Sequence, residues 1–251
     1  PGHNIEIRKV KLSNHSKEAK RLEITSYLEV VADSHLAELS HPAFNKLFIE
    51  SEFLPEHKIF LSRRRSGKTA ESLCLMHTVK TDRRPVKKVE YENDRMKFIG
   101  RNNSPENPAA VVGSIPFSNR AGFCSDPIMS LRVAISIPAG QSASVSFITG
   151  VCESMEEAIR ISEELDTEYR IDDVFEKFKL QSEIELKYLE IGRNQLTAFQ
   201  DLISPIFYPN AAYRGPQQNI IRNNKNQSAL WKFGISGDNP IMLLTVRSVQ
   251  D

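Results

Sequence analysis

The chain has 251 residues, of which 40% are hydrophobic and 26% are charged. This length allows one large all-β domain or a β-sandwich with a helical appendage. The formal net charge of +1 provides no strong field to attract nucleic acid or anionic lipid, so we expect neither as a partner. No apolar run approaches the roughly 20 residues that span a bilayer, and no direct membrane insertion is expected.

The cysteine count and the start of the chain bear on its compartment. Cys74, Cys124 and Cys152 are odd in number and widely separated, which fits neither a disulfide framework nor a zinc site. We expect three reduced thiols in a reducing compartment. The chain begins at Pro1 without a signal peptide. We therefore expect a cytoplasmic fragment of a longer protein.

The first 150 residues alternate apolar and polar side chains with the period of two that is typical of half-buried strands. A strand over 5–12 and a second over 22–31 are predicted to form a hairpin with a longer loop. A second hairpin is predicted from strands over 128–137 and 142–151, separated by Pro138-Ala139-Gly140. Further strands are expected over 46–54, 58–63, 72–81, 86–92 and 95–99.

Helical periodicity replaces this pattern after residue 152. Ser154 and Glu157 have the spacing of a capping box, in which each side chain accepts a hydrogen bond from the other residue's amide. A short helix follows, and then a longer helix runs from about Asp172 to Gly192. Another helix is expected over 194–207, where Pro205 bends or ends it.

The chain is therefore predicted to be mainly β with a helical linker. Many short strands without a βαβ rhythm favour an antiparallel β-sandwich. The predicted parts are a sandwich over 1–152, a helical linker over 153–210, and a loop and strand over 211–251, with extended structure at 241–246.

No complete catalytic, nucleotide-binding or metal-binding motif is present. Ser66-Gly67-Lys68-Thr69 is similar to the end of a P-loop, but Ser62 stands where that loop needs a glycine, so an exposed turn is expected. The six histidines lack metal-ligand spacing. His77 lies in a strand pattern and fits a satisfied core or face residue better than a base.

The stretch between residues 98 and 127 differs in composition from a segment with only a structural role. It is rich in Asn, Arg, Gly and Pro, and its amide and guanidinium groups suit sugar hydroxyls. Loops on a rigid sandwich are common binding positions. The alternative is a long surface loop packed by its own turns. The candidate substrate-binding residues at this rim are Arg101, Asn102, Asn107, Arg120 and Asp126.

A second stretch holds the only tryptophan, with two glycines and an aspartate nearby. Its candidates for a sugar subsite are Trp231, Ser236 and Asp238, because aromatic rings stack on the apolar faces of sugars. The alternative is a tryptophan that anchors the linker to a following domain.

Motifs in a consistent order along nearly the whole chain carry a family resemblance. They include Glu6-Ile7-Arg8-Lys9-Val10, His41-Pro42-Ala43-Phe44, Phe98-Ile99-Gly100-Arg101, Asp126-Pro127-Ile128 and Gly234-Ile235-Ser236-Gly237-Asp238. Together they resemble the sandwich and linker region of glycoside hydrolase family 94, formerly glycosyltransferase family 36. Within it, the chain is similar to the cyclic β-1,2-glucan synthase and β-1,2-oligoglucan phosphorylase group. The turn from Asn119 to Gly122 departs from the family pattern, which weakens any role assigned to Arg120.

The resemblance implies a galactose-mutarotase-like supersandwich, which this chain enters partway. It also implies linker helices and a catalytic acid in an (α/α)6 barrel that this chain lacks. The activity implied for the parent is inverting phosphorolysis of β-1,2-glucan, or chain-length control in cyclic β-1,2-glucan synthesis. Inorganic phosphate is the co-substrate and no cofactor is expected. No catalytic residue can be assigned in this chain.

The expected partners are a β-glucan oligosaccharide and the (α/α)6 domain of the parent chain, with a homodimer left open. The location is cytoplasmic, or the cytoplasmic face of the inner membrane for a glucan synthase. Two other hypotheses stay open: an independent carbohydrate-binding module and a free-standing interaction protein.

Overall fold

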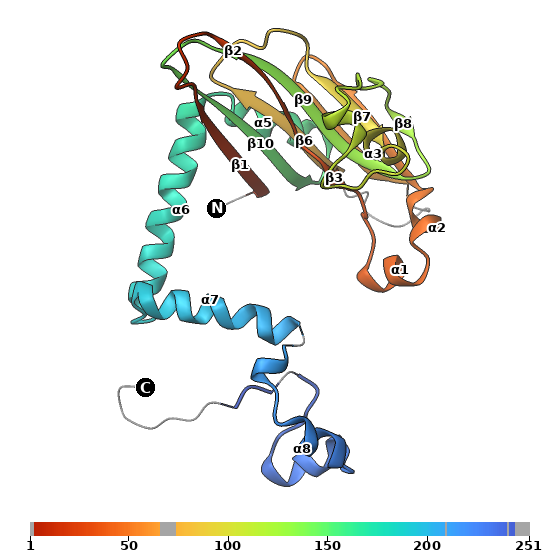
Figure 1. Cartoon of the computed structure of the whole chain (residues 1–251), viewed down its shortest axis with the longest axis vertical. Coiled ribbons are helices and arrows are strands. Elements are labelled where there is room, and N and C mark those ends of the chain that lie inside the picture. The colour runs from red at the N-terminus through yellow and green to blue at the C-terminus, as the bar shows by residue number, and fades with distance from the viewer. Residues whose placement is uncertain (1–2, 66–73, 209, 240, 244–251) are drawn as a thin grey trace. The chain divides into compact units, whose positions relative to one another are not determined.

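A computed structural model describes residues 3–65, 74–208, 210–239 and 241–243 (Figure 1). It divides into two compact units, residues 1–178 and 179–251. The P-loop-like segment Ser66-Gly67-Lys68-Thr69 and its expected turn lie outside the described residues. The predicted boundaries at 152 and 210 stay predictions.

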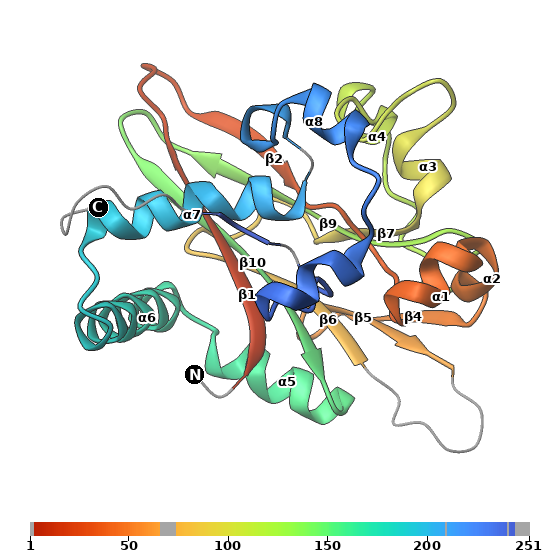
Figure 2. The same ribbon diagram turned by 90° about the horizontal axis from the view of Figure 1, so that it is seen from below.

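The first unit contains two antiparallel sheets. The larger sheet has six strands in the spatial order β1-β10-β6-β5-β4-β8, most of which Figure 2 shows following one another across the sheet. In that order they are Asn4–Ser13, Ser142–Cys152, Cys74–Thr81, Ile59–Arg64, Ile49–Leu54 and Gly122–Phe123. The smaller sheet is built around β9 (Pro127–Ile137), which pairs with β2 (Lys20–Thr25), β3 (Leu28–Glu29) and β7 (Glu90–Asp94). The expected mainly β fold, an antiparallel sandwich followed by helices, is confirmed.

The larger sheet buries apolar side chains on both of its faces. One face packs against the smaller sheet, where Val79 and Val145 join Leu131 and Val133 of β9 in one cluster. The other face is covered by α5 (Met155–Glu164), whose Ala158 and Ile161 share a second cluster with strand residues. Because successive side chains of a strand point to opposite faces, this sheet is the middle layer of the unit.

Both predicted hairpins are wrong, although their strands are close to the predicted positions. β9 and β10 belong to different sheets, and β1 pairs with β10 whereas β2 pairs with β9. Alternation shows which face of a strand is buried, but it does not show the partner strand. The two connections that cross between the sheets brace each other, because the Asn14 side-chain amide donates to the carbonyl oxygens of Ile137 and Pro138.

The strand predicted over 95–99 is also wrong, because this segment is α3 (Arg95–Ile99). The Asp94 carboxylate accepts hydrogen bonds from the amides of Met96 and Lys97 and so caps the helix. Gly100 ends it with a φ of +80°, in the region that favours glycine. The strand predicted from residue 46 begins at Ile49 instead, because α2 (Pro42–Lys46) precedes it.

The remaining helices of the first unit are α1 (His35–Ser40) and α4 (Ala109–Val112). The Ser154 hydroxyl caps α5 as predicted and accepts from the Glu157 amide at 3.2 Å. The Glu157 carboxylate accepts from the amide of Glu153 instead of that of Ser154. Helix α6 (Glu168–Tyr188) starts four residues before the predicted Asp172.

The second unit contains α7 (Arg193–Phe207), α8 (Gln217–Arg222) and two 3-10 helices, η1 (Ala211–Tyr213) and η2 (Gln227–Phe233). Gly192 is the N-cap of α7, whereas it was predicted to end the preceding helix, which ends at Tyr188. Pro205 lies inside the last turn of α7. Residues 241–243 have no regular structure, and the rest of the extended segment predicted there lies outside the described residues. No described residue after 178 is buried.

No described helix is long and apolar enough to cross a lipid bilayer.

Candidate functional site

The loop region with the first set of predicted residues is held by a buried carboxylate, Glu92 of β7. The residue is only 2% exposed. One carboxylate oxygen accepts from the amides of Asn93 and Asp94 and from the Ser118 hydroxyl, and the other accepts from the Ser118 amide at 2.8 Å. These bonds fix the end of the loop against the smaller sheet.

A buried arginine fixes the middle of the same loop. The Arg132 guanidinium, on β9, donates to the carbonyl oxygens of Ala110 and Ile115. It lies 4.0 Å from the centre of the Phe117 ring and 3.6 Å from the Glu90 carboxylate. These contacts hold the loop region in place against the smaller sheet.

The predicted rim residues lie on this fixed loop. Arg101, Asn102, Asn107 and Arg120 are exposed, and their side chains make no hydrogen bond or ion pair with the described part of the chain. Asp126 differs, because its carboxylate is 2.8 Å from the Lys46 ammonium and 3.7 Å from the Arg95 guanidinium. The first four side chains are free to contact a ligand, whereas Asp126 is engaged within the protein.

Next to Asp126 lies a polar network that the sequence did not reveal. The Tyr27 hydroxyl donates to Glu29 at 2.6 Å, and Arg95 donates to Glu29 at 2.8 Å and to the Tyr27 oxygen at 3.1 Å. Burial, with the hydrogen bond to Glu29, raises the pKa of Tyr27 to about 12. The hydrogen bond from Tyr27, followed by that from Arg95, lowers the pKa of Glu29. A neutral phenol beside an ionised carboxylate is therefore held at this end of the sandwich.

The second set of predicted residues lies in the other unit. Trp231, in η2, is 65% exposed. The Gln227 side-chain amide donates to the Asp238 carboxylate at 2.7 Å and to the Ser236 carbonyl oxygen at 2.8 Å, which closes the loop. The structure thus divides the predicted residues between two units, and their role in sugar binding stays a prediction.

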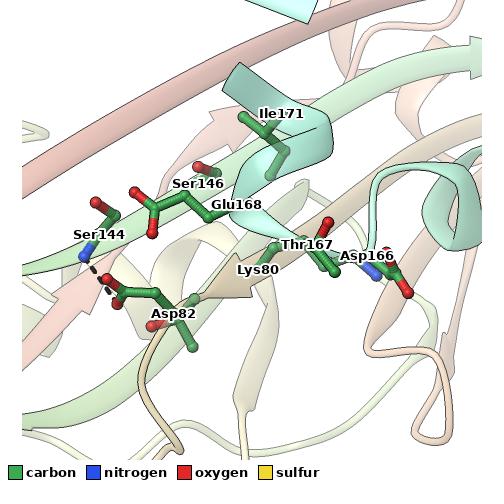
Figure 3. Close-up of a pocket in the computed structure, with 9 residues that line it drawn as sticks. Lys80, Asp82, Ser144, Ser146, Asp166, Thr167, Glu168 and Ile171 are labelled. Atoms are coloured by element: carbon green, nitrogen blue, oxygen red, sulfur yellow. Dashed lines mark hydrogen bonds between the residues drawn. The ribbon is translucent and has the colours of Figure 1, made fainter. Parts of the chain in front are cut away.

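A cavity of about 280 Å³, lined mainly by polar residue types, opens on the face of the larger sheet that α5 also covers (Figure 3). Ala143, Val145 and Phe147 of β10 point into the sandwich core, so the alternate residues Ser144 and Ser146 point to the opposite face. The cavity is lined by Lys80, Thr81, Asp82, Ser144, Ser146, Asp166, Thr167, Glu168 and Ile171.

Ion pairs hold the α6 side of this cavity in place. The Lys9 ammonium lies 2.7 Å from the Glu168 carboxylate and 2.6 Å from that of Asp172. The hydrogen bond from Lys9, followed by one with Ser144, lowers the pKa of Glu168. Asp82 accepts a 2.9 Å hydrogen bond from the Ser144 amide, drawn as a dashed line in Figure 3. The sequence did contain a signal for this cavity, because Ser144 and Ser146 alternate with apolar residues in a buried strand.

His77 is a core residue, as expected. Its side chain is 1% exposed, and its two ring nitrogens hydrogen-bond the hydroxyls of Ser26 and Thr149 at 2.7 and 2.8 Å. Burial lowers the pKa of His77 to about 4. Among the described residues, no group of three or more His, Cys, Asp or Glu side chains could hold a metal ion.

Comparison with known proteins identifies similar sequences. The family model of the glycosyl hydrolase 94 supersandwich domain matches residues 1–168. The cyclic β-(1,2)-glucan synthase NdvB of Rhizobium meliloti (strain 1021) is 30% identical over 255 residues, which cover 99% of this chain and 9% of that protein. The chain thus spans less than a tenth of the length of this relative.

Proposed function

Because the chain belongs to the glycosyl hydrolase 94 supersandwich domain family, we propose that it is the non-catalytic sandwich-plus-linker portion of a longer enzyme that acts on β-1,2-glucan. The observation that carries the proposal is similarity along 99% of the chain to a cyclic β-(1,2)-glucan synthase, of which it matches only 9%. A longer parent leaves room for a catalytic domain outside this chain.

The proposed reaction of the parent is inverting phosphorolysis. One acid protonates the leaving glycosidic oxygen, and inorganic phosphate attacks the anomeric carbon from the opposite face to give α-glucose 1-phosphate. In a cyclic glucan synthase, the same reaction would control chain length. The acid and the phosphate-binding groups belong to an (α/α)6 domain of the parent. No cofactor is needed, and we place the reaction in the cytoplasm or on the cytoplasmic face of the inner membrane.

The role of this chain in that reaction is to present contacts at the rim of the substrate path. Arg101, Asn102, Asn107 and Arg120 are suitable because they are exposed, unpaired within the described chain and carried by an anchored loop. Guanidinium and amide groups hydrogen-bond sugar hydroxyls. Single substitutions here are expected to raise the KM for glucan more than they lower kcat, because the reacting bond lies elsewhere.

The catalytic domain is also the proposed partner of the second unit. Several large apolar side chains are exposed in this unit, namely Phe199, Ile203, Phe207, Trp231 and Phe233. Exposed apolar surface of this kind is typical of an interaction site. The length of the relative beyond the matched region supports an intramolecular partner over a second copy of the chain. A homodimer of this chain in solution, measured by light scattering, would favour the second copy.

The parent enzyme tests the reaction. Incubated with β-1,2-glucan and inorganic phosphate, it is expected to release glucose 1-phosphate as the α anomer, which ³¹P and ¹H NMR identify. β-1,3-Glucan is the matched control and is expected to release none. Release of free glucose without glucose 1-phosphate would contradict phosphorolysis.

A further inference from the structure

We propose that the cavity between β6, β10 and the start of α6 is a sugar-binding site that takes one glucosyl unit of a glucan. The inference deepens the proposed function and rests on it for the identity of the sugar. It concerns residues that neither the rim loop nor the second unit contains.

The walls of the cavity come from three elements in fixed register. Ser144 and Ser146 lie two residues apart on one face of β10, and Ser146 is the register partner of Lys80 on β6. Asp82 follows at the end of β6, and Thr167 and Glu168 mark the start of α6. Figure 3 shows side chains from all three elements around the cavity. The site is therefore built on a sheet and a helix terminus, which hold side chains more rigidly than loops do.

Two polar groups in the cavity lack partners in the described protein. Ser146 is only 4% exposed, and its hydroxyl makes no hydrogen bond to the described residues. The Lys80 ammonium has no hydrogen bond or ion pair within 4.0 Å there either, although the Asp166 and Glu163 carboxylates attract it from a greater distance, and burial lowers its pKa. Both groups line the open cavity, where a ligand can reach them. A ligand that supplies hydroxyl groups would satisfy both side chains.

The charge of the cavity selects a neutral ligand. Its lining holds one ammonium, from Lys80, and three carboxylates, from Asp82, Asp166 and Glu168. Lys9 pairs with Glu168 and Arg170 with Asp166, so the charges around the cavity largely balance and favour a neutral ligand over inorganic phosphate. A sugar hydroxyl donates to a carboxylate and accepts from an ammonium or a serine hydroxyl, so it matches the mixture of groups.

The size of the cavity limits how much sugar it can hold. A volume of about 280 Å³ lies just below the range of about 300–1,000 Å³ that is usual for drug-sized ligands. One pyranose ring fits this space better than an extended oligosaccharide does. Ile171 offers an apolar wall for the C–H face of the ring, but no aromatic side chain lines the cavity. We therefore expect weak binding, with a Kd on the order of 1 mM.

An NMR titration of the 251-residue chain tests the inference. The probe is sophorose, the β-1,2-linked glucose disaccharide, and inorganic phosphate and MgCl₂ are titrated separately. Saturable shifts are expected at the amides of Ser144, Ser146 and Glu168 with sophorose alone. No shift at these amides up to about 50 mM sophorose, or saturation by phosphate or Mg²⁺ instead, would overturn the inference.

Matched variants separate binding from folding. Ser146→Leu fills the cavity and Lys80→Met removes the ammonium while keeping the stem, and each is expected to weaken sophorose binding at least about tenfold. Asp82→Asn is expected to weaken it, whereas Asp173→Asn, on the exposed side of α6, is the chemically matched control and should not. Unchanged binding in both Ser146→Leu and Lys80→Met, with folding verified by NMR, would contradict the site.

The outcome is independent of the parent's reaction. If the parent releases glucose 1-phosphate and the cavity binds no sophorose, only this inference fails. If the cavity binds sophorose and the parent releases none, phosphorolysis fails and the sugar site stands.

Discussion

His77 is a titratable residue that lies in the buried core. Its ordinary pKa of 6.5 falls to about 4 in the folded chain, chiefly through burial, and the positive charge of Arg8 acts in the same direction. Between these two values the unfolded chain binds a proton that the folded chain does not. The stabilising effect of the neutral ring is therefore complete above pH 6.5 and is lost as the pH falls towards 4.

We predict that His77→Gln reduces the acid sensitivity of folding. The difference between 6.5 and about 4 corresponds to roughly 3 kcal/mol of unfolding free energy. Glutamine keeps hydrogen-bonding capacity towards Ser26 and Thr149 but does not titrate. Urea unfolding at pH 7, 5.5 and 4.5 should show a smaller loss for the variant than for the unaltered chain. Parallel losses in the two proteins would show that His77 does not control the effect.

The cysteines give a second prediction at this scale. Cys74 and Cys152 are register partners on β6 and β10, both buried as free thiols, and burial raises the pKa of Cys152 to about 11. Cys124 is only partly buried. Since the thiolate is the reactive form, an alkylating reagent at pH 8 should modify Cys124 in the folded chain and all three cysteines only after unfolding. Mass spectrometry of labelled peptides measures this, and early labelling of Cys152 would contradict it.

Single residues were predictable where their surroundings follow from a strand pattern. His77 as a satisfied core residue is such a case. Ser146 and Lys80 were not predicted, because their proximity depends on the pairing of β6 with β10, which no spacing along the chain reveals. The Tyr27–Glu29–Arg95 network was missed for the same reason, since Arg95 is distant in sequence.

At the scale of elements, strand positions were predictable and strand partners were not. The alternation over 128–137 and 142–151 is real, but it arises because both strands bury a face in the shared core between two sheets. In the segment 95–99, the apolar residues Phe98 and Ile99 could belong to a strand or a helix, and the Asp94 cap and Gly100 decide for the helix. The start of α5 was predicted because its cap is local.

The loop anchored by Arg132 provides a prediction for this scale. Replacing Arg132 by Met leaves two loop carbonyl oxygens without their donor, and the Glu90 carboxylate keeps only its contact with Lys87. We expect a loss of about 3–5 kcal/mol in unfolding free energy and faster proteolysis between residues 100 and 120. Arg101→Met, which changes an exposed arginine of the same loop, is the matched control. Equal effects of the two substitutions would contradict an anchoring role.

At the scale of the whole molecule, the buried core is distributed unequally between the two units. In the described part of the chain, the clusters of buried apolar side chains all lie within residues 1–178, and no described residue beyond that point is buried. A chain that ends at residue 178 is therefore expected to keep its β-sheet circular dichroism signal, with a Tm within about 4 °C of the longer chain. A cooperative loss of the β signal in the shorter chain would show that the second unit completes the core.

At this scale the family and the fold were predictable from ordered motifs, and the family match confirms them. Which of the predicted site residues lie in the same unit was not predictable, because the sequence does not show which loops belong together. Arg101 and Arg120 lie on the first unit and Trp231 on the second.

Turnover by the 251-residue chain itself tests the central claim most directly. The chain is incubated with β-1,2-glucan and inorganic phosphate under conditions in which the parent enzyme is active, and glucose 1-phosphate is measured by a coupled enzymatic assay. We predict no product from the chain alone. Sustained release of glucose 1-phosphate from the purified chain would mean that it holds its own catalytic acid, and would contradict the assignment of a non-catalytic role.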